Sequence, residues 1–250
     1  MPVGISGFPG VYDRVRLSNP ALFGPGYVPP PHELEMVTAG NNIRLFTLPS
    51  EWVCKIWRPA LGSRVEPLFA PIILRDWPDV GGANKSHDLL IYDKIHWHRD
   101  NMVPRVADAL IAHLTARGLT FRCIRYGRHH IDEFRMALRS VRAMAFLSAH
   151  ETQGLAYQEA MASGIPIFAW DEGKLVDPAE RQFAPVGLRV SSVPYFDERC
   201  GATFREDNLE QRFDRFWAGM NSYRPRQFVA DNLSPEKSAR RYLELLDRVG

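Results

Sequence analysis

Apolar and polar positions follow a regular pattern only from His87 onward. Buried strands are predicted at four short apolar runs, 89–92, 121–126, 143–147 and 165–170. The segments between these runs carry apolar residues at helical spacing, and two of them end at Gly118 and Gly164, as helices commonly do. Strands that alternate with helices predict a mainly parallel sheet covered on both faces.

The same pattern predicts further elements on both sides of the last apolar run. Helices are expected where apolar residues recur every three or four positions, around 103–114, 134–141, 155–162, 213–220 and 235–249. Ser234 and Pro235 are typical of an N-cap and a first helical position, so the last helix is the most clearly marked. Leu188–Val193 is expected to form an additional strand.

The first 86 residues are less regular. Residues 1–42 are rich in Gly and Pro and predict mostly loops with short elements, whereas 43–48 alternates like a strand and Ser50 is suited to cap a helix after it. Pro and Gly interrupt the chain again between residues 64 and 84. We predict a short N-terminal region at 1–75, a linker at 76–86 and a regular parallel-sheet domain at 87–250.

Composition excludes several classes of protein. The chain has 31 Lys and Arg against 29 Asp and Glu, which gives no broad footprint for nucleic acid and no polybasic membrane anchor. No segment approaches the run of about 18 apolar residues that a membrane span needs, and the start of the chain lacks a signal-peptide pattern. Three widely spaced cysteines without a CxxC pair are typical of reduced thiols. A cytoplasmic protein is expected.

The segment 143–171 carries the candidate chemistry. Its predicted strand, loop, helix and strand form a βαβ unit, whose ligands usually lie beyond the carboxyl ends of the strands, here at Ser148–Gly154. This interpretation puts Glu151 in the crevice and Glu159 on the helix that lines it. The phosphate-binding patterns GxGxxG and the P-loop are both missing, but free N–H groups at the start of this helix could hold a phosphate. The alternative is that both glutamates are solvated charges at helix ends.

At this segment the sequence resembles the signature of the retaining GT-B fold nucleotide-sugar glycosyltransferases, the group 1 glycosyl transferases. Their pattern is a Glu, seven residues, a second Glu, Ala-Met-Ala-x-Gly-x-Pro and an apolar strand. The matching positions are Glu151, Glu159, Ala160, Met161, Ala162, Gly164 and Pro166. The resemblance implies a GT-B-like α/β fold with one Rossmann-like parallel-sheet domain and a shortened N-terminal region. It also implies that residues 87–250 bind the nucleotide-sugar donor and that residues 1–75 form the acceptor side.

The resemblance also implies a role for each site residue. Glu159 would hold the ribose hydroxyls, while Glu151 and the backbone amides around Gln153, Gly154 and Leu155 would face the donor sugar and the diphosphate. A basic pair would neutralise the leaving diphosphate and a strand end would hold the nucleotide base. The matching positions are Lys94 and Arg99 for the pair, and Tyr126 and Gly127 for the base. The spacing of the basic pair departs by one residue from the usual pattern.

The resulting hypothesis is a glycosyltransferase, or its donor-binding half, that moves a sugar from a nucleotide-diphosphate donor to a glycan, lipid or small-molecule acceptor. The short N-terminal region keeps a second hypothesis open, a non-catalytic nucleotide-sugar-binding or partner subunit, and a partner chain or homo-oligomer is possible. A third is an unrelated nucleotide-binding module. No cofactor and no metal are expected, because the pairs His96, His98 and His129, His130 have no further ligand at a recognised spacing.

Overall fold

The computed structural model describes residues 1–6, 18–25, 30, 33 and 41–250, which form two compact units. The first unit contains Met1–Pro71, Asp177–Arg189 and Pro235–Gly250. The second unit contains Ile72–Val176 and Val190–Ser234. Each unit has its own parallel sheet, so the predicted α/β class is confirmed.

The first unit is built on a four-stranded parallel sheet whose strands follow their order in the chain. The strands are β1 (Val3–Ile5), β2 (Ala21–Phe23), β3 (Ile43–Leu48) and β4 (Val65–Pro67). Helix α3 (Glu51–Leu61) follows β3 and buries side chains at helical spacing, including Trp52 and Ile56. The predicted strand and helix after residue 42 are therefore present. Ser50 lies at the N-cap, but its side chain makes no capping hydrogen bond.

The last helix, α11 (Pro235–Asp247), belongs to the first unit together with the segment that contains α8 (Pro178–Arg181). Leu245 of α11 is buried with Leu22 of β2 and Leu45 of β3. The helix itself was expected, but its assignment to a domain that spans 87–250 does not match these units. The apolar face of α11 is buried against the first sheet, and this packing decides which unit contains it.

The second unit has a five-stranded, fully parallel sheet in the order β6-β5-β7-β8-β9. Its strands are β5 (His87–Asp93), β6 (Phe121–Arg125), β7 (Val141–Leu147), β8 (Ile167–Trp170) and β9 (Gly201–Phe204). The chain adds β6 on one side of β5 and then crosses to add β7 on the other side. The carboxyl ends of β5 and β7 therefore form the point where strand order reverses.

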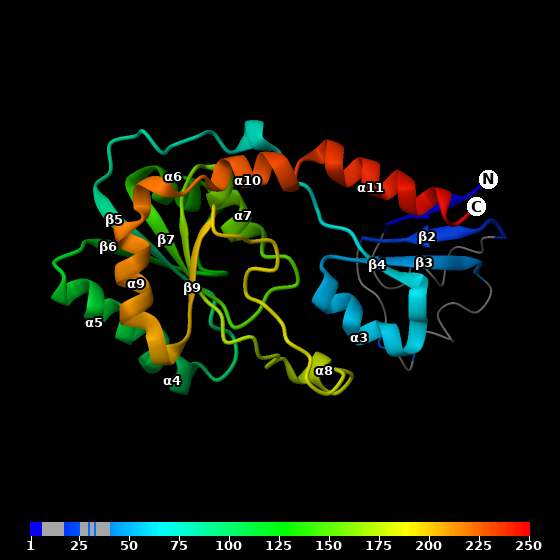
Figure 1. Cartoon of the computed structure of the whole chain (residues 1–250), viewed down its shortest axis with the longest axis horizontal. Helices are drawn as coiled ribbons and strands as arrows, with labels where there is room; N and C mark the ends of the chain where they lie inside the picture. The colour runs from blue at the N-terminus through cyan, green and yellow to red at the C-terminus, as the bar shows by residue number, and fades with distance from the viewer. Residues whose placement is uncertain (7–17, 26–29, 31–32, 34–40) are drawn as a thin grey trace. The chain divides into compact units, whose positions relative to one another are not determined.

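Helices cover both faces of this second sheet (Figure 1). One face carries α5 (Ala109–Ala116) and α9 (Leu209–Ala218), and the other carries α6 (Ile131–Ser140) and α7 (Leu155–Ala162), with α10 (Pro225–Asn232) beside α7. A short helix, α4 (Arg99–Met102), continues into α5 through a wider π-helical stretch, Val103–Asp108. Pro104 lies in this stretch, five residues after the start of α4, where its missing N–H removes an intrahelical hydrogen bond and favours an irregular turn.

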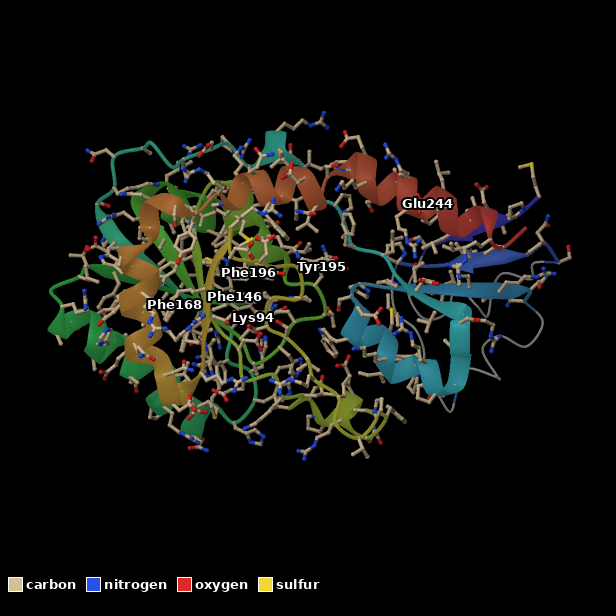
Figure 2. The ribbon with its side chains drawn as sticks, in the orientation of Figure 1. Lys94, Phe146, Phe168, Tyr195, Phe196 and Glu244 are labelled. Atoms are coloured by element: carbon tan, nitrogen blue, oxygen red, sulfur yellow. The ribbon has the colours of Figure 1, made fainter. Side chains whose placement is uncertain are left out.

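Aromatic side chains fix the packing on each face of the second sheet. On one face, Phe168 of β8 stacks on Phe204 of β9 with ring centroids 4.4 Å apart and contacts Phe213 of α9. On the other face, Phe146 of β7 contacts Tyr157 of α7 at 5.4 Å (Figure 2). Successive residues of a strand point to opposite faces, so a single strand can supply both layers. The site at the strand ends therefore rests on a sheet that is buried on both sides.

The segment predicted as a linker, 76–86, is packed onto the second unit. Trp77 lies edge-on to Phe134 of α6, with ring centroids 6.1 Å apart. The Arg226 guanidinium donates hydrogen bonds to the carbonyl oxygens of Trp77 and Ala162, the first at 2.6 Å. Pro and Gly keep this segment irregular. The burial of Trp77 and the hydrogen bonds from Arg226 hold it against the second unit.

A predicted strand and the predicted end of a helix are both wrong. Leu188–Val193 forms no strand, and the fifth strand is β9 instead. Residues 188–193 make only isolated backbone contacts, such as the Val190 amide to the Gly173 carbonyl at 3.4 Å, in place of a ladder. Val141 was expected at the end of a helix, but it is the first residue of β7, because α6 ends at Ser140.

Replacing Gly201 with Ala should destabilise the second unit. Gly201 has a φ of +142°, and an added Cβ would lie 1.9 Å from the carbonyl oxygen of Ile167, its partner on β8. Backbone strain and forced separation of the two strands should together cost about 2 kcal/mol or more in the free energy of unfolding. Urea denaturation followed by circular dichroism measures this loss.

The matched control is Gly219→Ala, which makes the same chemical change at a φ of −86°, where the nearest atom to an added Cβ is 3.4 Å away. This variant should stay within about 0.5 kcal/mol of the unchanged protein. Equal stabilities for the two variants would mean that β9 does not require the close approach at Gly201.

Candidate functional site

The residues predicted to bind a donor lie at the carboxyl ends of β5, β6 and β7. Lys94 directly follows β5, Tyr126 directly follows β6, and Glu151 lies in the loop after β7. The strand register aligns the last residues of all three strands, so the three loops leave the sheet at one edge. This edge includes the reversal of strand order, where open parallel sheets commonly bind ligands.

Lys94 and Glu151 form an ion pair across this reversal. The Lys94 Nζ lies 2.8 Å from the Glu151 Oε2, and the two side chains are 17% and 8% exposed. The Lys94 amide also donates a hydrogen bond to the Leu147 carbonyl at 2.9 Å, which ties the turn after β5 to the end of β7. Glu151 is therefore the buried partner of a cation rather than a solvated charge at a helix end.

Two serines hold Glu151 in place. The fully buried Ser148 donates from its Oγ to the Glu151 Oε1 at 2.7 Å, and the Glu151 amide donates to the Ser191 carbonyl at 3.0 Å. Ser191 is anchored in turn by a hydrogen bond from its Oγ to Asp171 at 2.7 Å. One carboxylate oxygen thus faces a hydroxyl and the other faces Lys94, so the orientation of the carboxylate is fixed.

An aromatic group surrounds the ion pair. The Lys94 Nζ lies 4.5 Å from the centre of the Tyr126 ring, in a cation–π contact. His96 lies edge-on to Tyr126 with ring centroids 5.4 Å apart, and burial lowers the pKa of His96. Trp97 stacks on His150 at 4.6 Å. Tyr126 is 47% exposed, so part of its ring is open to a flat apolar ligand such as a nucleotide base.

Arg99 serves a different purpose from Lys94 in this structure. Its guanidinium forms two hydrogen bonds with the carboxylate of Asp93, at 2.9 and 2.7 Å, and a third with the Ile95 carbonyl at 2.6 Å. Burial opposes ionisation of Asp93, but the hydrogen bonds from Arg99 and the Ile95 amide lower the pKa of Asp93 below its usual range. Arg99 therefore clamps the turn that carries Lys94, and it does not extend a free guanidinium toward the crevice.

Glu159 has a very different environment from Glu151. It lies on α7, and within the described ranges no hydrogen bond or ion pair reaches its carboxylate. Burial raises the pKa of Glu159 to about 7, and the nearby Arg135 offsets only part of this effect. A half-buried carboxylate that lacks donors is destabilised until a ligand supplies them. This is the state expected of a side chain that binds hydroxyl groups.

The start of α7 presents backbone amides to the same edge. Gly154 precedes the helix with a φ of +82°, and an added Cβ would lie 2.3 Å from the Tyr157 ring and 3.3 Å from the Cβ of Glu151. Glycine is therefore required both by the backbone conformation and by the close approach. Leu155, the first residue of α7, is 46% exposed, so the first turn of the helix is accessible to a ligand.

The prediction for Gln153 concerned its backbone amide, and the structure gives its side chain a role in bracing the loop. Its side chain is buried, and its Nε2 donates to the Gln158 Oε1 at 3.0 Å, while the Gln158 Nε2 donates to the Gln153 carbonyl at 3.0 Å. This reciprocal pair braces the loop against α7. Gly127 has a φ of +74° directly after Tyr126, and it lets the chain turn at the end of β6.

Several residues at this edge were not predicted from the sequence. Ser148 begins the predicted ligand segment Ser148–Gly154, but its hydrogen bond to Glu151 was not predicted. The stacking of Trp97 on His150 could not be inferred from the sequence, because the two residues are far apart in the chain and no local motif marks either of them. Ser191 lies in the segment that was expected to be a strand, and that expectation hid its contact with Glu151.

No cluster of three or more His, Cys, Asp or Glu side chains is arranged to hold a metal ion in the part of the chain that the structure describes. His96 contacts the aromatic rings at the site, and His129 lies edge-on to Tyr92 at 5.5 Å. The three cysteines are free thiols, and burial raises the pKa of Cys200 to about 12. No helix within these ranges combines the length and the apolar character needed to cross a membrane.

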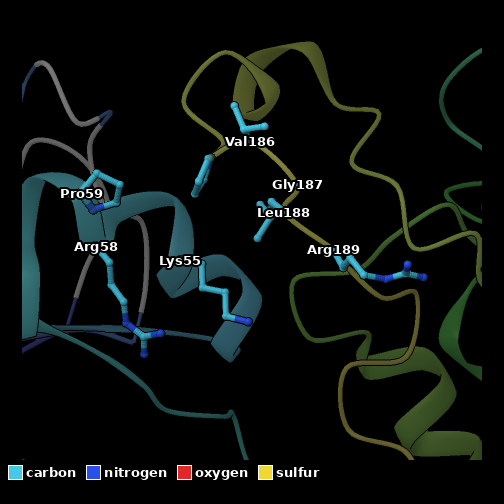
Figure 3. A pocket seen from close by; sticks show the side chains of 8 residues that line it. Lys55, Arg58, Pro59, Val186, Gly187, Leu188 and Arg189 are labelled. Atoms are coloured by element: carbon cyan, nitrogen blue, oxygen red, sulfur yellow. The ribbon is translucent and has the colours of Figure 1, made fainter.

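The first unit carries a separate cavity of about 640 Å³ (Figure 3). It is lined by Lys55, Arg58 and Pro59 of α3 and by Pro185, Val186, Gly187, Leu188 and Arg189. The Arg58 guanidinium is hydrogen-bonded to both carboxylate oxygens of Glu51, so its charge is compensated. Lys55 and Arg189 leave the lining mixed in character, cationic and apolar. None of these residues belongs to the unit that carries the strand-end site.

Comparison with known proteins gives matches at the level of structure only. No family model matches the sequence, and no curated protein matches it. Among solved structures, TarM is 13% identical with a TM-score of 0.58 over 98% of this chain and 54% of the TarM chain. The pneumococcal O-GlcNAc transferase GtfA is 12% identical with a TM-score of 0.55 over 96% of this chain and 54% of GtfA.

A third match is sucrose-phosphate synthase from Thermosynechococcus elongatus, at 13% identity and a TM-score of 0.59 over 99% of this chain and 73% of that enzyme. The chain spans about half the length of TarM and GtfA. These proteins are glycosyltransferases of the GT-B type. The fold that the resemblance implies is thus confirmed, and the chain has the fold of the GT-B glycosyltransferases.

Proposed function

We propose that this chain is a glycosyltransferase that takes a sugar from a nucleotide-diphosphate-sugar donor and passes it to an acceptor hydroxyl with retention of configuration. The observation that carries the proposal is the set of side chains at the reversal of strand order within a GT-B fold. A cation, Lys94, lies there with a buried carboxylate, Glu151. Glu159 is on the adjoining helix, and its half-buried carboxylate has no hydrogen-bond or ion-pair partner among the described residues.

The donor half of the proposal follows from what each group can bind. Glu159 would accept hydrogen bonds from the two ribose hydroxyls, which would satisfy its buried carboxylate. The first-turn amides at Gly154 and Leu155 and the ammonium of Lys94 would face the diphosphate, and Tyr126 would stack on the base. The solved structure of GtfA is a complex with UDP and GlcNAc, which supports a nucleotide diphosphate as the ligand to test first.

The chemical step requires stabilisation of a leaving group. The bond between the anomeric carbon and the β-phosphate oxygen breaks, and its electron pair leaves with the diphosphate. The acceptor oxygen forms its bond to the same carbon on the same face, and its proton passes to the departing phosphate oxygen. Lys94 would stabilise the charge that develops on the diphosphate. Arg99 would act as a positioning residue, because it fixes Asp93 and the turn that carries Lys94.

A second candidate is a nucleotide-sugar-binding partner subunit without turnover of its own. It is favoured by the solved GtfA/B complex, in which one such protein is part of an assembly. The two candidates share the donor site and differ in whether this chain alone completes the reaction.

The test of the proposal is a panel of nucleotides and nucleotide sugars. Calorimetric titration with UDP, ADP, GDP and their glucose and N-acetylglucosamine derivatives should identify one base that binds. Release of the nucleoside diphosphate from that donor, with or without added sugars as acceptors, should then be detectable. Binding without any release supports the partner subunit, and no binding across the panel contradicts both candidates.

Replacing Lys94 with Met should lower turnover far more than donor binding. Loss of one charge-stabilising group typically costs about 10²- to 10³-fold in kcat, and Lys94→Arg should restore part of it. The rate of nucleoside diphosphate release at saturating donor measures this effect. The control is Lys174→Met, which removes an exposed cation from the loop after β8. Equal losses in both variants would indicate a general field effect and would remove the assignment of Lys94.

Donor affinity should fall as the pH is lowered through about 7. The pKa of Glu159 is raised to about 7, so the carboxylate that accepts the ribose hydroxyls is increasingly protonated below this pH. A nucleotide sugar is the suitable probe, because its diphosphate has no ionisation in this range. Affinity should decline by up to about tenfold per pH unit below the pKa, while Glu159→Gln should bind weakly and without pH dependence between 6 and 8. A pH-independent affinity in the unchanged protein would contradict the ribose assignment.

A further inference from the structure

The ion pair between Lys94 and Glu151 raises a question that the assignment of a donor site leaves open. The same ammonium that would face a diphosphate already contacts a carboxylate at 2.8 Å. A nucleoside diphosphate and Glu151 are both anionic, so they compete for one cation. The outcome depends on what else can satisfy Glu151 once Lys94 turns to the phosphates.

Glu151 has little access to water that could replace Lys94. Its side chain is only 8% exposed, its amide is bonded to the Ser191 carbonyl, and its Oε1 faces the hydroxyl of Ser148. The carboxylate therefore cannot swing out to solvent when its cation is drawn away. A buried carboxylate that loses its cation and gains a neighbouring phosphate is strongly destabilised.

Lys94 is likewise confined. It is 17% exposed, its ammonium lies over the Tyr126 ring, and its amide is bonded to the Leu147 carbonyl. The ammonium can shift between the carboxylate and a ligand in the crevice, but it cannot reach a distant position. Any anion that binds beside it must share it with Glu151 or displace Glu151 from it.

A sugar-free and a sugar-bearing nucleoside diphosphate differ in the hydrogen-bond donors that they offer to Glu151. The sugar-free ligand takes the cation and supplies no hydrogen-bond donor in return. The sugar-bearing ligand also draws on Lys94, but it brings hydroxyl groups that can donate to the Glu151 Oε2 as the ammonium leaves it. The ion pair thus lowers the affinity for the sugar-free ligand more than the affinity for the sugar-bearing ligand. This is selectivity through an unfavourable contact.

We infer that the Lys94–Glu151 ion pair is a specificity determinant that makes the site prefer a sugar-bearing nucleoside diphosphate over the sugar-free nucleoside diphosphate. This inference rests on the proposed function and adds a role for Glu151 beyond contact with the sugar. The ion pair would also favour product release during turnover, because the sugar-free product would be bound more weakly than the donor.

The test compares matched ligand pairs, UDP with UDP-N-acetylglucosamine and ADP with ADP-glucose, by calorimetric titration. The readout is the ratio of the Kd of the sugar-free ligand to the Kd of the sugar-bearing ligand. In Glu151→Gln the side chain keeps its shape and can still accept from Ser148, but it no longer competes for the ammonium. The sugar-free ligand should bind about tenfold more tightly or better, and the ratio should fall by a similar factor.

Ser148→Ala tests the same idea with the opposite sign and with all charges intact. Glu151 then loses the hydrogen bond from the Ser148 hydroxyl and depends more on Lys94, so the sugar-free ligand should bind more weakly and the ratio should rise, by about threefold or more. A variant that had merely loosened the loop would weaken both ligands in proportion and would leave the ratio unchanged. Thermal melts of the two variants check that each is folded.

The matched control is Glu172→Gln, which removes a carboxylate from the loop after β8 at the same edge of the sheet. Glu172 accepts hydrogen bonds from the Trp170 indole and the Glu206 amide, and its carboxylate has no cation partner among the described residues. It should leave the ratio unchanged. An equal fall of the ratio in this control, or an unchanged ratio in Glu151→Gln, overturns the inference while donor binding still supports the proposed function. Absence of binding by the unchanged protein to every ligand overturns both.

Discussion

The pairing of β5 with β7 is the constraint on which the candidate site depends. The register runs from His87 opposite Val141 to Asp93 opposite Leu147, so both strands end at the same level. The hydrogen bond from the Lys94 amide to the Leu147 carbonyl extends this pairing by one residue. A shift of the register by one residue would exchange the faces of every side chain on β7 and would separate Lys94 from Glu151. The chemistry of the site therefore begins in the alignment of two buried strands.

The two glutamates of the site show how position on one framework gives identical side chains different properties. Glu151 lies in a loop that is fixed by serines and a cation, so its charge is compensated within the protein. Glu159 is held by a helix whose neighbours bury it, and the nearby Arg135 offsets only part of the effect of this burial. A rigid sheet and helix can keep the second carboxylate in this unfavourable state, because the packing around it is stable on its own.

The sequence was sufficient to predict the parallel sheet, the βαβ unit and the positions of Lys94 and Glu151, because each depends on local patterns of apolar residues and on strand ends. It was insufficient wherever an element is defined by a distant partner. The strand β9 has a short, glycine-containing sequence and forms because β8 offers an edge beside Gly201. The clamp of Arg99 on Asp93 also depends on three-dimensional contact, and a sequence pattern alone gave the arginine a role at the diphosphate.

The division of the chain into two units has a consequence for how the protein can be dissected. The chain passes between the units after Pro71, Val176, Arg189 and Ser234, so the first unit is assembled from three separate segments and the second from two. Neither unit corresponds to one continuous stretch of sequence, and a truncation at any single residue removes part of one unit or of both. The second unit is thus complete only when its two segments, separated in sequence by thirteen residues of the first unit, are both present.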